Sequence, residues 1–193
     1  IQTPPVDRKS IKTVICKLDN IIIKNAISKE IDRNGQIFII TPQIKDIESL
    51  KKRIERIFPN IKYVVAHGKL RAQEIEKVMN EFYHHKADIL ISTSIIESGI
   101  DIPRANTLII NNADRFGLAQ LHQIRGRIGR SHLKSYAYFT IDKNTITPNA
   151  KRRLKAIQAM DALGAGINLA NYDLDIRGAG NLLGEEQSGQ ISQ

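Results

Sequence analysis

Three arginines and two glycines crowd into residues 123–130, which read Gln-Ile-Arg-Gly-Arg-Ile-Gly-Arg. Arginine suits phosphate because its planar fork is always charged and can donate two hydrogen bonds at once. Each glycine costs about 1 kcal/mol in a helix, which indicates that another group must come close to the chain here. An arginine aimed at a γ-phosphate stabilises the charge that develops in phosphoryl transfer. A run of charge is ordinarily a solvated surface, and the glycines are what favour a phosphate-facing site instead.

Hydroxyl groups gather in residues 92–103, Ser-Thr-Ser-Ile-Ile-Glu-Ser-Gly-Ile-Asp-Ile-Pro, directly after a short apolar run. Hydroxyls and nearby backbone N–H groups can hold a nucleic-acid phosphate, and a carboxylate can accept a hydrogen bond from a sugar hydroxyl. The same pattern also fits the start of a helix, with a hydroxyl residue at the N-cap and Glu97 as its capping partner. Both interpretations can hold together.

A His-Gly pair, His67 and Gly68, follows the apolar residues 61–66. Glycine lets another backbone approach, and a phosphate can lie on the exposed N–H groups of such a turn. Most His-Gly turns only reverse the chain, so this pair alone is a weak signal.

Alternating apolar runs and helical patterns must position these loops. Short apolar runs predict strands, and apolar residues at helical spacing predict helices between them, from residue 11 to about residue 140. This β-α-β-α order predicts an α/β fold, with an open, mostly parallel sheet and helices on both of its faces. Binding loops are then expected beyond the carboxyl ends of the strands. Asp19 is expected to cap the first helix, and Gly35 to end it.

The pattern changes near residue 150. Apolar spacing over residues 154–162 predicts one helix, and the glycines that follow predict a break before a second, short helix. An irregular glycine-rich loop comes next, and its composition alone does not indicate what it does. We therefore divide the chain into residues 1–148, a sheet-and-helix domain with a short N-terminal lead-in, and residues 149–193, a helical hairpin with its loop.

The composition describes a basic, globular chain of 193 residues. Its formal net charge of +9 and pI of about 9.7 favour a polyanionic partner, because phosphate contacts release counterions. The alternative is a basic subdomain whose charge other parts of a longer chain offset. Cys16, the single cysteine, excludes an internal disulfide or a cysteine-built zinc site and suits a reducing cytoplasm. No apolar run is long enough to cross a bilayer, so we predict a cytoplasmic protein without a membrane partner or a metal site of its own.

In their order and spacing, these loops resemble the second RecA-like lobe of superfamily 2 helicases. Residues 93–103 are similar to motif V of that family, and residues 123–130 match its motif VI, Q-x-x-G-R-x-G-R. The resemblance implies that Gln123 contacts an ATP molecule bound on another lobe. It also implies that Arg127 and Arg130 are arginine fingers.

The same resemblance assigns roles to the other loops. It implies that Gly99 and Asp101 help to close the cleft and reach the nucleotide side. The residues implied to grip the phosphates of a DNA strand are His67, Gly68, Lys69 and Thr93. Lys69 replaces a glutamine that is more usual in the family, so the family pattern does not describe its contacts fully.

The glycine-rich tail resembles the translocation motif of two relatives, the RecG-type branch-migration helicases and the transcription-repair coupling factors. Ala179 stands where RecG-type proteins usually carry proline, and Glu185 and Glu186 precede Gln187, as they do in the coupling factors. The resemblance covers nearly the whole chain. The residues implied to couple lobe closure to DNA are Arg153, Arg177 and Gln187.

Two motifs of a complete motor do not occur in these 193 residues. There is no G-x-x-x-x-G-K-[ST] phosphate loop and no D-E-x-[DHQ] stretch. ATP and Mg²⁺ are therefore expected to be bound mainly by a first lobe of a longer chain, and this chain alone is expected to be inactive. Its start at Ile1 rather than Met agrees with that expectation.

The resemblance implies a second motor lobe of an ATP-dependent translocase on double-stranded DNA. The whole motor would displace stalled RNA polymerase and recruit excision-repair proteins through other domains. Two alternatives stay open at this point: a RecG-type fork remodeller, and a non-catalytic nucleic-acid-binding module that keeps the fold. Intact Gln123, Arg127 and Arg130 argue against the second, because a module that only binds has no need for them.

Overall fold

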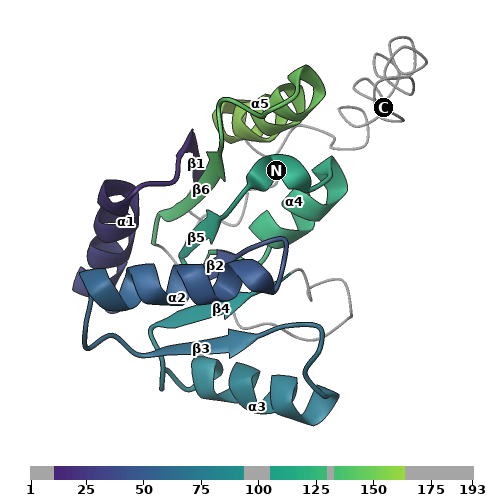
Figure 1. Cartoon of the computed structure of the whole chain (residues 1–193). Coiled ribbons are helices and arrows are strands. Elements are labelled where there is room, and N and C mark those ends of the chain that lie inside the picture. The colour runs from purple at the N-terminus through teal and green to yellow at the C-terminus, as the bar shows by residue number, and fades with distance from the viewer. Residues whose placement is uncertain (1–10, 94–104, 130–132, 164–193) are drawn as a thin grey trace, which may run out of the picture.

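The computed structural model describes residues 11–93, 105–129 and 133–163. The elements in chain order are β1 (Ile11–Lys17), α1 (Asn20–Asp32), β2 (Ile37–Ile40), α2 (Lys45–Ile57), β3 (Tyr63–Ala66), α3 (Ala72–Tyr83), β4 (Ile89–Ser92), β5 (Thr107–Ile110), the 3₁₀ helix η2 (Ala113–Arg115), α4 (Leu118–Arg125), β6 (Ser135–Ile141) and α5 (Pro148–Leu163). The strands form one sheet in the order β1-β6-β5-β2-β4-β3, and every neighbouring pair is parallel (Figure 1). The predicted α/β fold with a parallel sheet is therefore confirmed.

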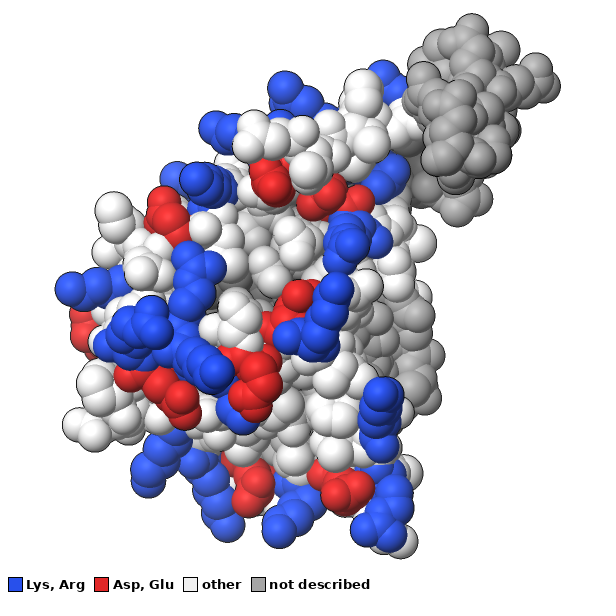
Figure 2. All heavy atoms as spheres, viewed as in Figure 1, with Lys and Arg blue, Asp and Glu red and all other residues white. Residues whose placement is uncertain are grey.

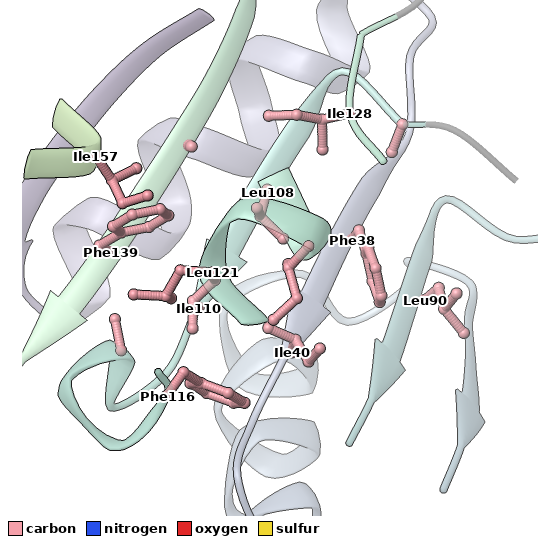
Figure 3. Packing of buried hydrophobic residues seen from close by; sticks show 14 of the residues in the cluster. Phe38, Ile40, Leu90, Leu108, Ile110, Phe116, Leu121, Ile128, Phe139 and Ile157 are labelled. Atoms are coloured by element: carbon pink, nitrogen blue, oxygen red, sulfur yellow. The ribbon is translucent and has the colours of Figure 1, made fainter. Parts of the chain in front are cut away.

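Two hydrophobic clusters cover the two faces of the sheet. One contains Ile37 and Ile39 of β2 together with buried residues of α1 and α2. The other contains Phe38 and Ile40, with buried residues of α3, α4 and α5 (Figure 3). Successive side chains of a strand point to opposite faces, so a strand covered on both faces must be apolar throughout. This is why β2 reads as an unbroken apolar run.

The predicted start of α1 is confirmed, but its end differs from the prediction. The side chain of Asp19 accepts a hydrogen bond from the backbone N–H of Ile22 at 2.8 Å. At the other end the left-handed residue is Asn34, with φ of 60°, and not Gly35. The N–H of Gly35 instead donates to the carbonyl of Glu30 at 2.9 Å. Asparagine tolerates the left-handed conformation, so the helix ends before the glycine is reached.

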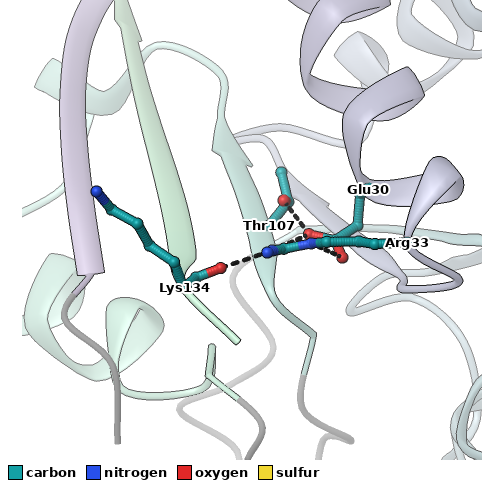
Figure 4. A network of polar contacts seen from close by, with 4 residues as sticks. All are labelled: Glu30, Arg33, Thr107 and Lys134. Carbon is teal, nitrogen blue, oxygen red and sulfur yellow. Dashed lines mark hydrogen bonds and ion pairs between the residues drawn. The ribbon is translucent and has the colours of Figure 1, made fainter. Parts of the chain in front are cut away.

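Gly35 is required by a buried carboxylate. The side chain of Glu30 is fully buried, and Arg33 donates to both of its oxygens at 2.8 Å. Thr107 donates to the same carboxylate, and Arg33 also donates to the carbonyl of Lys134 at 2.6 Å (Figure 4). A Cβ atom on Gly35 would lie 1.8 Å from Glu30 Oε2. The network ties α1 to β5 and to the chain entering β6, and the sequence pattern did not predict it.

Helix α5 packs on the sheet. Its residues Leu154 and Ile157 are buried in the same cluster as Phe139 of β6. The predicted second helix and the glycine-rich loop lie outside the described residues, so the boundary after residue 148 stays a prediction. Among the described residues, no helix combines the length and the apolar character needed to span a bilayer.

Candidate nucleotide and nucleic-acid sites

The carboxyl ends of β3 and β4 bring two of the predicted DNA-binding loops together. Ala66 ends β3 and is in register with Ser92, which ends β4. The backbone N–H of Thr93 donates to the carbonyl of Ala66 at 3.3 Å, and His67 follows Ala66 directly. Thr93 and the turn at His67 are therefore neighbours, although the sequence separates them by 26 positions, from 67 to 93.

Gly68 lies in open space at the tip of this turn. A Cβ atom there would meet nothing within 4 Å, and Gly68 is not among the residues with positive φ. The turn is held by the Lys69 N–H, which donates to His67 Nδ1 at 3.2 Å, and the Lys69 side chain is exposed. Neither the backbone conformation nor the packing of the described residues requires glycine here. A ligand that closely approaches the turn from solvent would explain why residue 68 is a glycine.

A hydrogen-bonded chain at the ends of β2 and β5 was missed from the sequence. Asn111 Nδ2 donates to Thr41 Oγ1 at 3.1 Å, and the Thr41 hydroxyl donates to Asp46 Oδ2 at 3.4 Å. The N–H of Thr41 also donates to the carbonyl of Ser92 at 2.9 Å. These bonds fix the carboxyl edge of the sheet beside the loops that are predicted to bind DNA. A polar residue directly after each buried strand is the signal that could have revealed them.

The predicted nucleotide-facing residues lie at the opposite edge. Strands β5 and β6 are parallel, so α4 must run from the carboxyl end of β5 back to the amino end of β6 (Figure 1). Gln123 and Arg127 are consequently at the amino edge of the sheet. These two residues therefore lie away from the carboxyl ends, where binding loops were expected, because the motif stands at the end of a helix and not at the end of a strand.

One of the two glycines of this motif has a structural reason of its own. Helix α4 ends at Arg125, and its C-cap Gly126 has a helical backbone conformation that does not require glycine. Gly129 has φ of 106°, in the region that favours glycine, and its N–H donates to the carbonyl of Ala105 at 2.7 Å. This bond turns the chain toward the residues that precede β5. Gly129 is therefore explained by its backbone conformation, without a ligand.

The structure separates two arginines that look alike in the sequence. Arg127 is half-exposed, and its guanidinium has no hydrogen-bond or ion-pair partner among the described residues. Arg125 is only 9% exposed and donates to Thr13 Oγ1 at 2.8 Å and to the Ile157 carbonyl at 3.3 Å. His122 is exposed, but partial desolvation lowers the pKa of its imidazole, and the charge of Arg125 lowers this pKa further. Gln123, one turn before Arg127, is exposed.

Arg153 attaches α5 to the 3₁₀ helix η2. Its Nη2 donates to the backbone carbonyl of Asp114 at 3.1 Å, and burial lowers the pKa of its guanidinium while the nearby charge of Asp114 opposes that shift. Arg153 Nε is buried and has no hydrogen-bond partner among the described residues. This arginine is therefore placed to hold α5 in position.

Five of the predicted site residues lie outside the described residues, namely Gly99, Asp101, Arg130, Arg177 and Gln187. Within the described part of the chain, no group of three His, Cys, Asp or Glu side chains could hold a metal ion. Basic side chains are spread over the visible face and are interspersed with Asp and Glu, so net charge alone does not locate a nucleic-acid site (Figure 2).

Several known proteins are similar to this chain in sequence. A transcription-repair-coupling factor of Rickettsia typhi is 50% identical over 194 residues, which cover 100% of this chain and 17% of that protein. The corresponding factor of Escherichia coli is 47% identical over 192 residues, covering 99% of this chain and 17% of that protein. The chain thus spans about a sixth of the length of the curated relatives that it matches.

Among solved structures, RecG bound to a three-way DNA junction is similar, with a TM-score of 0.67 and 32% identity. The match covers 91% of this chain and 26% of that one. The model of the helicase conserved C-terminal domain matches residues 16–132, more than half of the chain. This chain belongs to the helicase conserved C-terminal domain family.

Proposed function

We propose that this chain is the second motor lobe of an ATP-dependent double-stranded DNA translocase. The whole motor displaces stalled RNA polymerase and couples transcription to nucleotide excision repair in the cytoplasm. The observation that carries the proposal is the 47–50% identity to transcription-repair-coupling factors along essentially the whole chain. The matched region includes the tail, which carries the residues that discriminate between the two candidate subfamilies. A first lobe of the same chain, the polymerase and excision-repair proteins are the proposed partners.

The amino edge suits a nucleotide held on the first lobe. The exposed amide of Gln123 and the guanidinium of Arg127, which has no partner among the described residues, are the groups that a polyphosphate requires. ATP bound there with Mg²⁺ supplies the phosphoanhydride whose hydrolysis drives movement. Gln123 contacts the nucleotide, and Arg127 with Arg130 neutralises the charge that develops on the γ-phosphoryl oxygens.

Two further residues belong to the same half-site. Gly99 and Asp101 follow Thr93 along the chain and precede β5, whose amino end is the edge that carries Arg127. We assign them to closing the cleft over the nucleotide. The lobe thus contributes charge neutralisation and orientation, while the phosphate loop and the metal ligands come from the first lobe.

The carboxyl edge suits the DNA backbone. The turn at His67 and Gly68 exposes backbone next to the cation of Lys69, and Thr93 lies beside it. Backbone N–H groups, hydroxyls and cations are the groups that proteins use to hold phosphates without reading sequence. A translocase needs such contacts because it moves over any sequence.

Hydrolysis at one edge must be transmitted to DNA at the other. Arg153 connects α5 to η2, and Arg125 connects α5 to α4, which carries Gln123. We assign Arg153, Arg177 and Gln187 to this transmission. Helix α5 is the element that would respond to a change at α4, because Arg125 donates to its backbone directly.

One alternative has an observation in its favour. RecG bound to a three-way junction is the similar solved structure with 32% identity, which favours fork remodelling. Against it stand the higher identity to coupling factors and the residues Ala179, Glu185 and Glu186. The second alternative, a module that only binds nucleic acid, gives no account of a half-exposed Arg127 beside Gln123.

The proposal is tested with the full-length protein and an RNA polymerase stalled on linear DNA. We expect ATP to release the transcript, and a non-hydrolysable analogue to leave it bound. A three-way junction serves as the matched substrate in the same assay. Branch migration of the junction without release of polymerase would support the fork remodeller instead, and DNA binding without ATP turnover would support the binding module.

A further inference from the structure

A polar hollow lies at the carboxyl ends of β1, β5 and β6, away from the DNA-binding loops described above. Its volume is about 510 Å³. Its polar lining residues, apart from one aspartate, are Lys17, Asn111, Asn112, Thr140, Lys143 and Asn144. The proposed contacts to nucleotide and to DNA leave this hollow unused.

A second hollow of about 430 Å³ adjoins the first and shares Ile141 and Lys143 with it. Lys151 and Lys155 of α5 line this second hollow. Together the two hollows carry four lysines, and none of the four forms an ion pair with a described residue. The one acidic side chain among the described lining residues is Asp142, whose Oδ1 accepts a hydrogen bond from the Asn144 N–H at 2.9 Å. The local balance is therefore positive.

We propose that this hollow binds the phosphodiester backbone of the same DNA duplex, as a second contact separate from the turn at His67. The inference rests on the proposed function, because it extends the DNA path of a translocase. Lys17 and Lys143 donate to phosphate oxygens, and the amides of Asn112 and Asn144 donate to phosphate or sugar oxygens. Bound phosphates would then neutralise the four lysines, which have no ion-pair partner in the described part of the chain.

The sheet order gives the geometry of this path. β3 and β1 are the two outer strands of six, and β3 carries the turn at His67 while β1 ends at Lys17. Five strand spacings separate them, which is about 24 Å. Duplex DNA rises about 3.4 Å per base pair, so the two contacts are about seven base pairs apart. One lobe would therefore hold most of a helical turn across the carboxyl edge of its sheet.

The lining favours nucleic acid over an acidic protein segment. Protein interfaces are anchored by aromatic or aliphatic side chains that enter well-packed pockets. Seven of the nine described residues that line the first hollow are polar or charged, and none is aromatic, whereas most of the aliphatic side chains, Ile15, Ile146 and Leu154, line only the second hollow. The hydrogen bond from Asn111 to Thr41 also joins the hollow to the end of β2, so that the polar edge continues toward β4 and β3.

The test is the salt dependence of duplex binding by the full-length protein without nucleotide. Removing one phosphate contact lowers the slope of log K against log salt by about 0.9. We expect this decrease for Lys143→Gln and for Lys17→Gln, and about twice the decrease for the double variant. Lys86→Gln is the matched control, because Lys86 is exposed and precedes β4 at the opposite edge of the sheet. Urea unfolding of each variant checks that the fold is kept.

Lys69→Gln separates this inference from the proposed function. If Lys69→Gln lowers the slope while Lys17→Gln and Lys143→Gln behave like Lys86→Gln, the second contact is wrong and the DNA path at β3 stands. If the protein binds no duplex, both proposals fall. Decreases for all three edge lysines, with none for Lys86→Gln, would establish the extended path.

Discussion

Arg125 Nη1 donates a hydrogen bond of 2.8 Å to Thr13 Oγ1, and 112 positions separate the two residues in the chain. The same guanidinium donates to the carbonyl of Ile157 on α5. One buried side chain thus connects α4, which carries Gln123, to the edge strand β1 and to α5. Arg127, only two positions further on, has a half-exposed side chain.

Replacing Arg125 should therefore reduce the stability of the protein much more than replacing Arg127. Arg125→Ala leaves a buried hydroxyl and a buried carbonyl without their charged donor, and we expect it to lower the free energy of unfolding by about 2–3 kcal/mol. Arg127→Ala should change it by less than about 0.5 kcal/mol, because surface substitutions usually do. Urea unfolding of both variants measures this difference. Equal losses of stability in the two variants would mean that the buried hydrogen bonds of Arg125 do not stabilise the fold.

The same pair separates stability from catalysis. In the full-length protein, we expect Arg127→Ala to lower kcat for ATP by roughly 10³–10⁵, the range that arginine fingers supply in other nucleotide hydrolases. Duplex binding should persist, since the proposed DNA contacts lie at the other edge of the sheet. DNA-stimulated phosphate release and a binding titration on one preparation provide the measurement. Turnover at the parental rate would remove Arg127 from the site.

The fold was predictable from sequence because its central strands β2, β4 and β5 are buried on both faces. β2 has four apolar residues and all four are buried, so that its apolar run identifies it without any tertiary information. The N-cap at Asp19 is equally local, since the bond it makes spans three residues. Features of this kind depend only on neighbouring residues in the chain.

The partners of buried charges could not be predicted in this way. Glu30 receives a hydrogen bond from Thr107, 77 positions away, and nothing in the pattern of α1 distinguishes it from a surface glutamate. Arg125 likewise resembles Arg127 until α5 folds over it. The residues of the motif could therefore be identified from the sequence. Which of its arginines is buried and which is exposed could not be predicted, because this depends on the packing of elements that are distant in the chain.

Two glycines provide a second matched comparison. Gly35→Ala places a Cβ atom 1.8 Å from a carboxylate oxygen of Glu30 that Arg33 and Thr107 hold in place, so we expect a loss of about 1–3 kcal/mol in stability. Gly68→Ala meets open space and should keep or slightly raise stability, by up to about 1 kcal/mol. Thermal unfolding measures both effects.

Gly68→Ala should nevertheless weaken duplex binding, because a methyl group at the exposed tip of the turn keeps a DNA backbone away from it. Gly117→Ala is a suitable control, since its Cβ atom would approach only Gln120 Oε1, at 3.9 Å. Unchanged duplex affinity in the stable Gly68→Ala variant would show that DNA does not approach this turn.

The titration of His122 gives a prediction about pH. Partial desolvation and the charge of Arg125 lower its pKa below the ordinary value of 6.5, so the folded protein binds this proton less tightly than the unfolded chain does. The resulting stability is present above about pH 6.5 and is lost as the pH falls through the lowered pKa. NMR titration in the folded state and in urea should give a lower midpoint for the folded protein, with His122→Gln identifying the resonance. A folded midpoint at or above the urea value would contradict the assigned cause.

The last prediction concerns transmission between the two edges. Arg153 holds α5 to η2 through the carbonyl of Asp114, and η2 lies between β5 and α4 in the chain. If α5 transmits motion from α4 toward the DNA, loosening this attachment should disconnect hydrolysis from movement. We expect Arg153→Ala in the full-length protein to keep most of its DNA-stimulated ATP hydrolysis and to lose displacement of a triplex-forming strand.

A structural role alone would give a different result, and a neighbouring residue supplies the control. Arg152 is exposed and donates within its own helix, to Asn149, so Arg152→Ala should leave both activities unchanged. Arg153→Lys keeps the charge but not the planar fork, and it should restore displacement only in part. If Arg153→Ala lowered hydrolysis and displacement by the same factor, the residue would merely stabilise the lobe. Loss of displacement with hydrolysis retained is the outcome that only a transmitting helix explains.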